Sequence, residues 1–322
     1  MAGQSVTPVT IGVDVGGTKT VIGLVSETGV VHAQAVSSTR GGFDDVAHVA
    51  DLLYRFVRTE SDPSRWSIRG IGAGFPEYVD ASGALTSHDV LAWTKQPSLL
   101  LTESVHAALR GVDVAPIIIE SDVRAGAYGE ALFGAARGFS SCLYISLGTG
   151  LSSSLFMNNS VWSGHRGEAI AIGEWPAPGR AANFSLEEYA SGAGISRRSE
   201  ALTGRVATTY DIVAAAHAGD DQCRVVVEQS GTAIGIALAS AVQLIDPALV
   251  VLGGGLGTSG GILGEAINRS YESRIRRRPD APKLVRARNG PLSGMLGAAA
   301  LAWQLDTSSN VLPPFGPRIR LT

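Results

Sequence analysis

The stretch Asp14-Val15-Gly16-Gly17-Thr18-Lys19-Thr20 sets two glycines and two threonines between apolar β-rich runs. The runs on either side, residues 10–15 and 20–26, are rich in Val, Ile and Thr, which favour strands. A third such run, 30–36, follows the compact turn Glu27-Thr28-Gly29. Three consecutive antiparallel strands are therefore predicted at the start of the chain.

The second half of the chain repeats this opening. Residues 143–147 form an apolar run, Leu147-Gly148-Thr149-Gly150 forms a glycine-threonine turn, and runs at 153–157 and 160–163 follow. This duplication predicts an α/β protein with two similar domains that face each other across a cleft, where ligands usually bind. We expect one domain from residues 1–121 with 293–305, a second from 122–292, and a surface tail from 306–322.

Periodicity predicts the remaining elements. Apolar residues at helical spacing indicate helices, and short β-branched runs bounded by turns indicate strands. Helices are predicted at 46–57, 99–109, 223–245, 262–276 and 295–304, and strands at 68–73, 115–120 and 249–252.

Composition narrows the class of function. The net charge of −3 and the pI near 6.1 give no basic field for nucleic acid or a membrane surface, so a small polar ligand is expected. Two cysteines in 322 residues exclude a disulfide framework. No leader pattern opens the sequence, and Gly, Asp or Arg interrupts every apolar run before ~18 residues, so no membrane-spanning helix is expected. We expect a cytoplasmic protein.

The two glycine-threonine turns suggest phosphate binding, because backbone N–H groups can approach an anion closely where no Cβ intervenes. Asp14, at a strand end, could hold Mg²⁺ through water. An ordinary glycine hairpin is the alternative for either turn alone. Gly253-Gly254-Gly255 after a strand could lie against a nucleotide base or ribose, although neither a Walker A nor a dinucleotide fingerprint is present.

In this order, several motifs resemble the ROK family of sugar kinases and sugar-responsive repressors. They are Asp14 to Thr20, Gly74-Phe75-Pro76 with Val79-Asp80, Ser121-Asp122 leading to Gly129-Glu130, Leu147 to Gly150, Glu187 to Gly192, Asp246-Pro247, and Gly253 to Gly255. The resemblance spans about residues 8–304 and implies a two-domain actin-like (ribonuclease H-like) ATPase fold with an interdomain cleft. It favours a kinase, because only about nine residues precede the first strand and the repressors carry a helix-turn-helix domain there.

The resemblance implies roles for the site residues. Asp122 would be the base that takes the proton of a sugar primary hydroxyl, by family analogy the 6-OH. ATP, with Mg²⁺, would contact Asp14, Gly16, Gly17, Thr18, Lys19, Thr20, Gly148, Thr149, Gly150, Gly253, Gly254 and Gly255. The sugar would contact Ser121, Asp122 and Glu187, with Glu77, Asp89, His165 and Glu174 as further candidates. A homodimer is also expected.

The sugar segment departs from the family pattern. Ser121 replaces an Asn, Ala171-Ile172-Gly173-Glu174 replaces Glu-x-Gly-His, and Glu77 and Asp89 are unusual carboxylates. The cysteine cluster of the family zinc site is missing before Glu187, so we expect no zinc, with Trp175 and Phe184 packing that segment instead.

The added carboxylates favour a cationic acceptor, because an ammonium could pair with one of them. An amino sugar such as kanosamine or a glucosamine-like hexosamine is preferred, with glucose or a cyclitol as alternatives. Glu77, Asp89 and Glu174 could instead face solvent or pair with Arg124, Arg166 or Arg180. Two further alternatives are a non-catalytic sugar sensor and a cytoskeletal actin-like ATPase.

Overall fold

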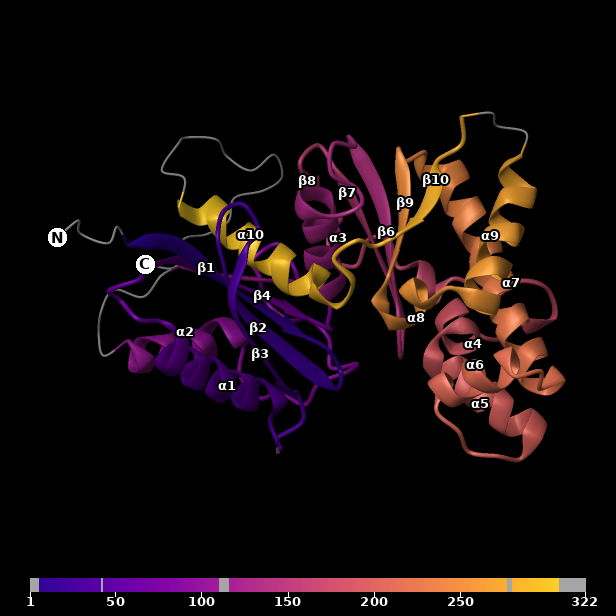
Figure 1. Cartoon of the computed structure of the whole chain (residues 1–322), viewed down its shortest axis with the longest axis horizontal. Coiled ribbons are helices and arrows are strands. Elements are labelled where there is room, and N and C mark those ends of the chain that lie inside the picture. Colours follow the sequence, from indigo (N-terminus) through magenta and orange to yellow (C-terminus); the bar gives the residue numbers. More distant parts are fainter. Residues whose placement is uncertain (1–5, 42, 110–115, 277–279, 307–322) are drawn as a thin grey trace. The chain divides into compact units, whose positions relative to one another are not determined.

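The computed structural model describes residues 6–41, 43–109, 116–276 and 280–306. Contacts divide these residues into two compact units. Unit 1 takes the described residues of Met1–Gly138, Asn159–Ala169 and Leu292–Thr322, and unit 2 those of Phe139–Asn158 and Ile170–Pro291. Figure 1 traces the elements along the chain.

Unit 1 is built on a five-stranded sheet with the order β3-β2-β1-β4-β5. Its first three strands are antiparallel neighbours, as predicted, whereas β1, β4 and β5 run parallel. The strands are β1 (Thr7–Val15), β2 (Lys19–Val25), β3 (Val31–Ser38), β4 (Trp66–Phe75) and β5 (Ile117–Ser121). The helices are α1 (Asp45–Glu60), α2 (Pro97–Ala108), α3 (Asp122–Phe133) and α10 (Ser293–Asp306).

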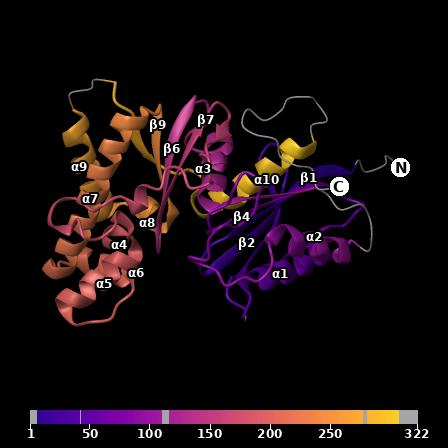
Figure 2. The ribbon, with the colours of Figure 1, turned by 180° about the vertical axis from the view of Figure 1, so that it is seen from behind.

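The two faces of this sheet pack differently. Ile11 and Val13 of β1 belong to the same apolar cluster as the buried residues of α1 and α2. On the other face of the sheet lies α10 (Figure 2), and the Cβ positions of Gly12 on β1 and Gly72 on β4 face this helix. A Cβ at Gly72 would lie 1.8 Å from the carbonyl oxygen of Ala298. Glycine is therefore required for α10 to rest directly on the sheet backbone.

Small residues also join α10 to α3. A Cβ at Gly297 would lie 1.7 Å from the Ala125 carbonyl oxygen, and one at Gly129 would lie 2.2 Å from that of Ser293. This contact groups α3 with unit 1, whereas the sequence placed a boundary at 121/122. Residues 159–169 also group with unit 1. Of the predicted tail, residues 307–322 lie outside the described residues.

Unit 2 repeats the sheet, because its order read from the opposite edge, β8-β7-β6-β9-β10, matches β3-β2-β1-β4-β5 strand by strand. Its own strands are β6 (Ser141–Leu147), β7 (Leu151–Met157), β9 (Leu249–Gly253) and β10 (Lys283–Arg286), and the edge strand of the sheet is β8 (Ser160–Val161), whose residues are among those grouped with unit 1. Its helices are α4 (Leu186–Ala190), α5 (Gly192–Thr203), α6 (Thr209–His217), α7 (Asp221–Ile245), α8 (Gly254–Ser259) and α9 (Gly261–Ile275). The duplication expected from the sequence is thus observed.

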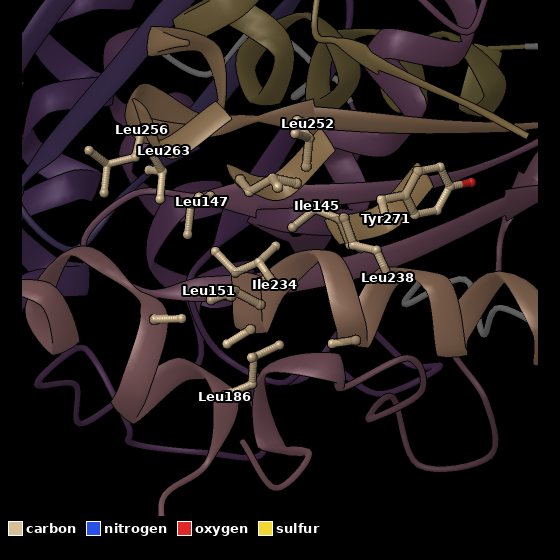
Figure 3. Close-up of a cluster of buried hydrophobic side chains, with 14 of the residues drawn as sticks. Ile145, Leu147, Leu151, Leu186, Ile234, Leu238, Leu252, Leu256, Leu263 and Tyr271 are labelled. Atoms are coloured by element: carbon tan, nitrogen blue, oxygen red, sulfur yellow. The ribbon is translucent and has the colours of Figure 1, made fainter. Parts of the chain in front are cut away.

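The core of unit 2 lies between its sheet and α7 and α9. Leu147, Leu151, Ile234 and Leu263 meet in one buried cluster, shown in Figure 3. By length and composition α7 could cross a membrane, although Gly231 and Gly235 interrupt its apolar sequence as expected. Its most apolar window is, however, 67% buried within the protein, as in a core helix.

The sequence missed several short elements. Helices α4, α5, α6 and α8 and strand β10 were not predicted. α5 and α8 are rich in Gly and Ser, and α4 and β10, with five and four residues, are too short to show a periodic apolar pattern. Each of α4, α5 and α6 begins at a Ser or Thr whose side chain accepts a backbone N–H. These caps were a local signal that could have identified the helices.

Candidate active site

The first glycine-threonine turn is a closed hairpin between β1 and β2. The Gly16 N–H donates to the Lys19 carbonyl oxygen at 2.9 Å. Thr39, a buried residue, donates its hydroxyl to the Gly16 carbonyl oxygen at 2.7 Å and its N–H to that of Thr18 at 3.0 Å. The buried Thr20 hydroxyl bonds to that of Thr39 at 2.9 Å. Thr20 therefore supports the turn from within, while Thr18 and Lys19 are exposed.

Asp14 lies at the end of β1, beside the first turn of α10. A Cβ at Gly294 would lie 2.4–2.5 Å from its carboxyl atoms, so only glycine allows this approach. Burial raises the pKa of Asp14 to about 7, and the charge of Lys19 opposes that rise. A divalent cation would supply the positive charge that favours the ionised carboxylate, so the residue fits a Mg²⁺ ligand.

Asp122 begins α3 directly after β5. Gly74, at the end of β4, makes room for it, because a Cβ there would lie 3.1 Å from the Asp122 Cα. Burial and the negative charge of Asp14 raise the pKa of Asp122 to about 8, and the charge of Glu77 adds to the rise. The N–H of Val123, 2.6 Å from Oδ1, and the charge of Arg124 oppose it.

These carboxylates share one edge of the sheet in unit 1. Asp14, Glu77 and Asp122 follow or end β1, β4 and β5, which are parallel neighbours, so their carboxyl ends meet. The mutual effects on pKa reflect this proximity. A carboxylate with a raised pKa beside a closed glycine turn is suited to proton transfer near neutral pH.

A buried ion pair joins Glu120 and Arg124, the residues two positions before and after Asp122. The guanidinium of Arg124 bonds to Glu120 at 2.5–2.6 Å, and both side chains are buried. Arg124 also donates to the carbonyl oxygens of Val79 at 2.5 Å and Gly167 at 3.1 Å. The sequence analysis missed this pair, although the i,i+4 spacing of Glu120 and Arg124 was a signal for it.

Glu77 is buried and its carboxylate is occupied by the chain itself. Oε1 accepts the N–H groups of Val90 at 2.9 Å and Leu91 at 2.7 Å. Oε2 accepts the N–H of Asp89 at 2.9 Å and the hydroxyl of Ser87. Among the described residues, Glu77 thus holds the 87–91 loop through both of its carboxylate oxygens.

The other candidates for the sugar site are distributed over both units. In unit 1, Ser121 is buried at the start of α3, whereas Asp89 and His165 are exposed. In unit 2, Glu174 is exposed after the tight contact of Gly173 with Leu151. Of the arginines suggested as partners, Arg124 bonds to Glu120, and Arg166 bonds to Glu168 at 2.6 Å.

The second glycine-threonine turn rests on the N-terminus of α5. The first N–H groups of α5, from Gly192 and Ala193, donate at 2.9 Å to the carbonyl oxygens of Gly148 and Thr149. Glu187, on α4, accepts the Leu151 N–H at 2.7 Å just after the turn. A Cβ at Gly148 would meet open space, so its backbone is accessible.

The three consecutive glycines are mainly explained by packing against β6. A Cβ at Gly253 would lie 2.2 Å from the Tyr144 hydroxyl oxygen, and Gly254 has φ 75° with the Leu147 carbonyl oxygen 2.3 Å from its Cβ position. Gly255 instead faces the hydroxyl of Tyr210, an exposed aromatic residue of α6. The sequence analysis did not identify Tyr210.

The segment before Glu187 is held by backbone hydrogen bonds and by packing on the core of unit 2. No group of three or more His, Cys, Asp or Glu side chains suited to a metal ion occurs in the described part of the chain. Ala177 donates its N–H to the Phe184 carbonyl oxygen at 2.9 Å, and Trp175 packs on the core of unit 2. The predicted packing role is confirmed for Trp175 and wrong for Phe184, which is 50% exposed.

Comparison with known proteins places these sites in context. The model of the ROK family matches residues 10–305. A glucokinase of Streptomyces coelicolor is 29% identical over an alignment that covers 92% of this chain and 98% of that protein.

Two solved structures extend the similarity. A ROK hexokinase from Thermus thermophilus has a TM-score of 0.76 and 28% identity, over 94% of this chain and all of that one. A ROK family glucokinase from Streptomyces griseus, in complex with glucose and AMPPNP, has a TM-score of 0.75 and 27% identity, over 92% of this chain and 99% of that one.

Proposed function

From the premise that this chain belongs to the ROK family, has its two-domain actin-like α/β fold and is an ATP-dependent sugar kinase, we propose that Asp122 is its catalytic base. The observation that carries this proposal is the position of Asp122. It starts α3 at the carboxyl end of β5, next to Asp14, with a pKa raised to about 8 by burial and by the charge of Asp14.

In the proposed reaction, a primary hydroxyl of the sugar, by family analogy the 6-OH, attacks the γ-phosphorus of ATP. The new O–P bond forms as the bond to the ADP oxygen breaks, and the hydroxyl proton passes to a carboxylate oxygen of Asp122. The exposed Thr18 and Lys19 of unit 1, and the accessible backbone of Gly148 in unit 2, would contact the phosphates. Thr20 would act indirectly, through its bond to Thr39.

Asp14 would hold Mg²⁺ at the carboxyl end of β1, directly or through water, where the ion would neutralise phosphate charge. The half-buried carboxylate and the nearby Lys19 are the features of this chain that support the assignment.

For the acceptor, we prefer an amino sugar, with a kanosamine-like or glucosamine-like hexose as the candidate class. Asp89 and Glu174 are exposed carboxylates that could pair with an ammonium, and Ser121 replaces a side chain with both donor and acceptor groups. Glu77 does not favour a cationic acceptor, because its oxygens already accept four hydrogen bonds.

A neutral hexose is the second candidate acceptor. It is favoured by the full-length similarity to proteins named glucokinase and by Glu187, the one family sugar contact retained unchanged. A sensor that does not catalyse is disfavoured by the retention of Asp122 together with both glycine-threonine turns, since a protein that only binds sugar does not need this combination.

The test is a coupled assay of the purified protein with MgATP against glucose, glucosamine, kanosamine, N-acetylglucosamine and a cyclitol, followed by NMR of the phosphorylated product. We expect the highest kcat/KM with an amino sugar and phosphate on its primary hydroxyl. Activity with glucose alone would contradict the amino-sugar proposal, and the absence of sugar-dependent ADP formation with every acceptor would favour the sensor.

Two variants test whether Asp89 and Glu174 bind the ammonium group of an amino sugar. Asp89→Asn and Glu174→Gln should each raise KM for the amino sugar by about tenfold, a change of ~1.4 kcal/mol, and should change KM for glucose little. Glu188→Gln is the matched control, since Glu188 caps α4 through Ser185 and only neighbours Glu187 in sequence. Equal effects on charged and neutral sugars would argue against pairing with an ammonium.

A further inference from the structure

The loop of residues 87–92 is held by carboxylates rather than by strand pairing. Glu77 accepts three successive N–H groups, those of Asp89, Val90 and Leu91, at 2.7–2.9 Å. Asp45, also buried, accepts the next one, from Ala92, at 2.9 Å. Four consecutive backbone donors are thus fixed by two buried acids, which leaves this loop little freedom.

The same loop lies against the first glycine-threonine turn. A Cβ at Gly17 would lie 3.2 Å from Cγ1 of Val90, so the valine side chain lies directly against the turn and a side chain at position 17 would press on it. Arg40 links the loop of residues 87–92 to the segment that holds the turn. It donates to the Val90 carbonyl oxygen at 2.6 Å and pairs with Asp45, and it directly follows Thr39, which holds Gly16.

We propose that Glu77 is a positioning residue for the nucleotide: by fixing residues 89–91 it keeps Val90 against Gly17 and so keeps the first turn in its phosphate-binding form. This inference rests on the proposed function, since it requires that the turn bind phosphate. The bonds of the Glu77 carboxylate go to residues 87, 89, 90 and 91. Its carboxylate is buried and fully used by the loop, and the loop makes the contact.

Two observations separate this role from simple loop stability. The contact with Gly17 comes from Val90, whose side chain is 37% exposed, so trimming it should not disturb the core. Asp44 offers a matched acid: it accepts the N–H of Thr94 in the same segment at 2.9 Å and caps α1 through Ala47, yet it makes none of the bonds to residues 87–91.

The experiment measures binding of MgAMPPNP by calorimetry, together with KM for ATP and for the sugar. Val90→Ala should raise the nucleotide Kd about tenfold and leave KM for the sugar unchanged. Glu77→Gln should raise the nucleotide Kd at least as much, because an amide NH₂ cannot accept the loop N–H groups. It should also raise KM for the sugar, because the loop carries Asp89. Asp44→Asn should change neither constant.

The outcomes distinguish this inference from the proposed function. Thr18→Ala should weaken MgAMPPNP binding if the first turn binds phosphate at all, and no effect there would overturn the proposed site. If Thr18→Ala weakens binding while Val90→Ala and Glu77→Gln do not, the positioning role is overturned and the site stands. A rise in KM for the sugar alone in Glu77→Gln would return Glu77 to the acceptor site.

Discussion

Asp122 is the residue on which the chemistry depends, and its replacement should separate catalysis from binding. Asp122→Asn keeps the size of the side chain but cannot accept the hydroxyl proton. We expect kcat to fall by about 10²- to 10⁴-fold, the usual contribution of a general base, while MgAMPPNP still binds. Steady-state kinetics and calorimetry on the same preparation check both parts.

The control for this variant is Asp62→Asn. Asp62 is an exposed turn carboxylate that accepts the Ser64 N–H at 2.9 Å. Asp62→Asn therefore makes the same chemical change at a residue that has no part in the proposed reaction. A comparable loss of kcat in Asp62→Asn, or full activity in Asp122→Asn, would contradict the assignment.

The pH dependence follows from the same carboxylate. A base works when ionised, and the pKa of Asp122 is raised to about 8 by burial and by Asp14. In the free enzyme, kcat/KM should therefore fall as the pH drops below about 8. A bound Mg²⁺ lowers the pKa, so the corresponding fall in kcat should occur at lower pH.

Glu77→Gln provides a test of the cause. The charge of Glu77 contributes to the raised pKa of Asp122, so the acidic limb of kcat/KM should move to lower pH in this variant, and Val90→Ala should not move it. A wild-type profile that is flat from pH 5 to 9 would show that Asp122 ionises in its ordinary range.

Among the elements, α10 depends most on small residues. A Cβ at Gly72 would lie 1.8 Å from the Ala298 carbonyl oxygen and 2.5 Å from its carbon, both backbone atoms that cannot move alone. Gly72→Ala should thus reduce the free energy of unfolding by about 1–3 kcal/mol or more. Urea unfolding monitored by circular dichroism measures the change.

Gly264→Ala is the matched substitution. Gly264 lies within α9, and the nearest atom to its Cβ position is an Arg286 nitrogen at 3.8 Å, an ordinary contact. Alanine has a higher helix propensity than glycine, so this variant should gain up to about 1 kcal/mol. A similar loss in both variants would show that the packing of α10 is not the cause.

The strands were predictable because their signal is local. β-rich runs between turns located all the strands of both sheets except β10, and the repeated turn indicated two similar α/β domains. The unit to which α3 belongs was not predictable, because its contact with α10 is made by glycines and alanines, which carry no periodic apolar signal.

The site was predictable to the extent that each residue acts through its own position in a motif. Asp14 and Asp122 end strands, and the structure brings them to one sheet edge in unit 1. The role of Glu77 in holding residues 89–91 was not predictable, since its partners are backbone N–H groups 12 to 14 residues away. Gly253 and Gly254 suggested a ligand, but their conformation and the neighbouring β6 account for them.

At the scale of the whole molecule, the carboxyl groups of Asp14 and Asp122 should make stability depend on pH. Their folded pKa values of about 7 and about 8 lie above the ordinary value of 3.8. The folded state therefore holds protons that the unfolded chain releases, and the stability that these groups provide at low pH is lost progressively as the pH rises from about 4 to about 8. Above that range both states are ionised and the dependence ends.

Asp122→Asn should remove part of this dependence. Its melting temperature should equal that of the wild type near pH 4 and exceed it increasingly up to about pH 8, because the amide carries no charge to desolvate. Asp62→Asn should show no such growing gap, since hydrogen bonds from Ser64 lower the pKa of Asp62. Calorimetric scans at pH 4, 6 and 8 measure the difference. A constant gap would mean that Asp122 is ionised at no cost in the folded protein, which would remove the electrostatic basis for its role as a poised base.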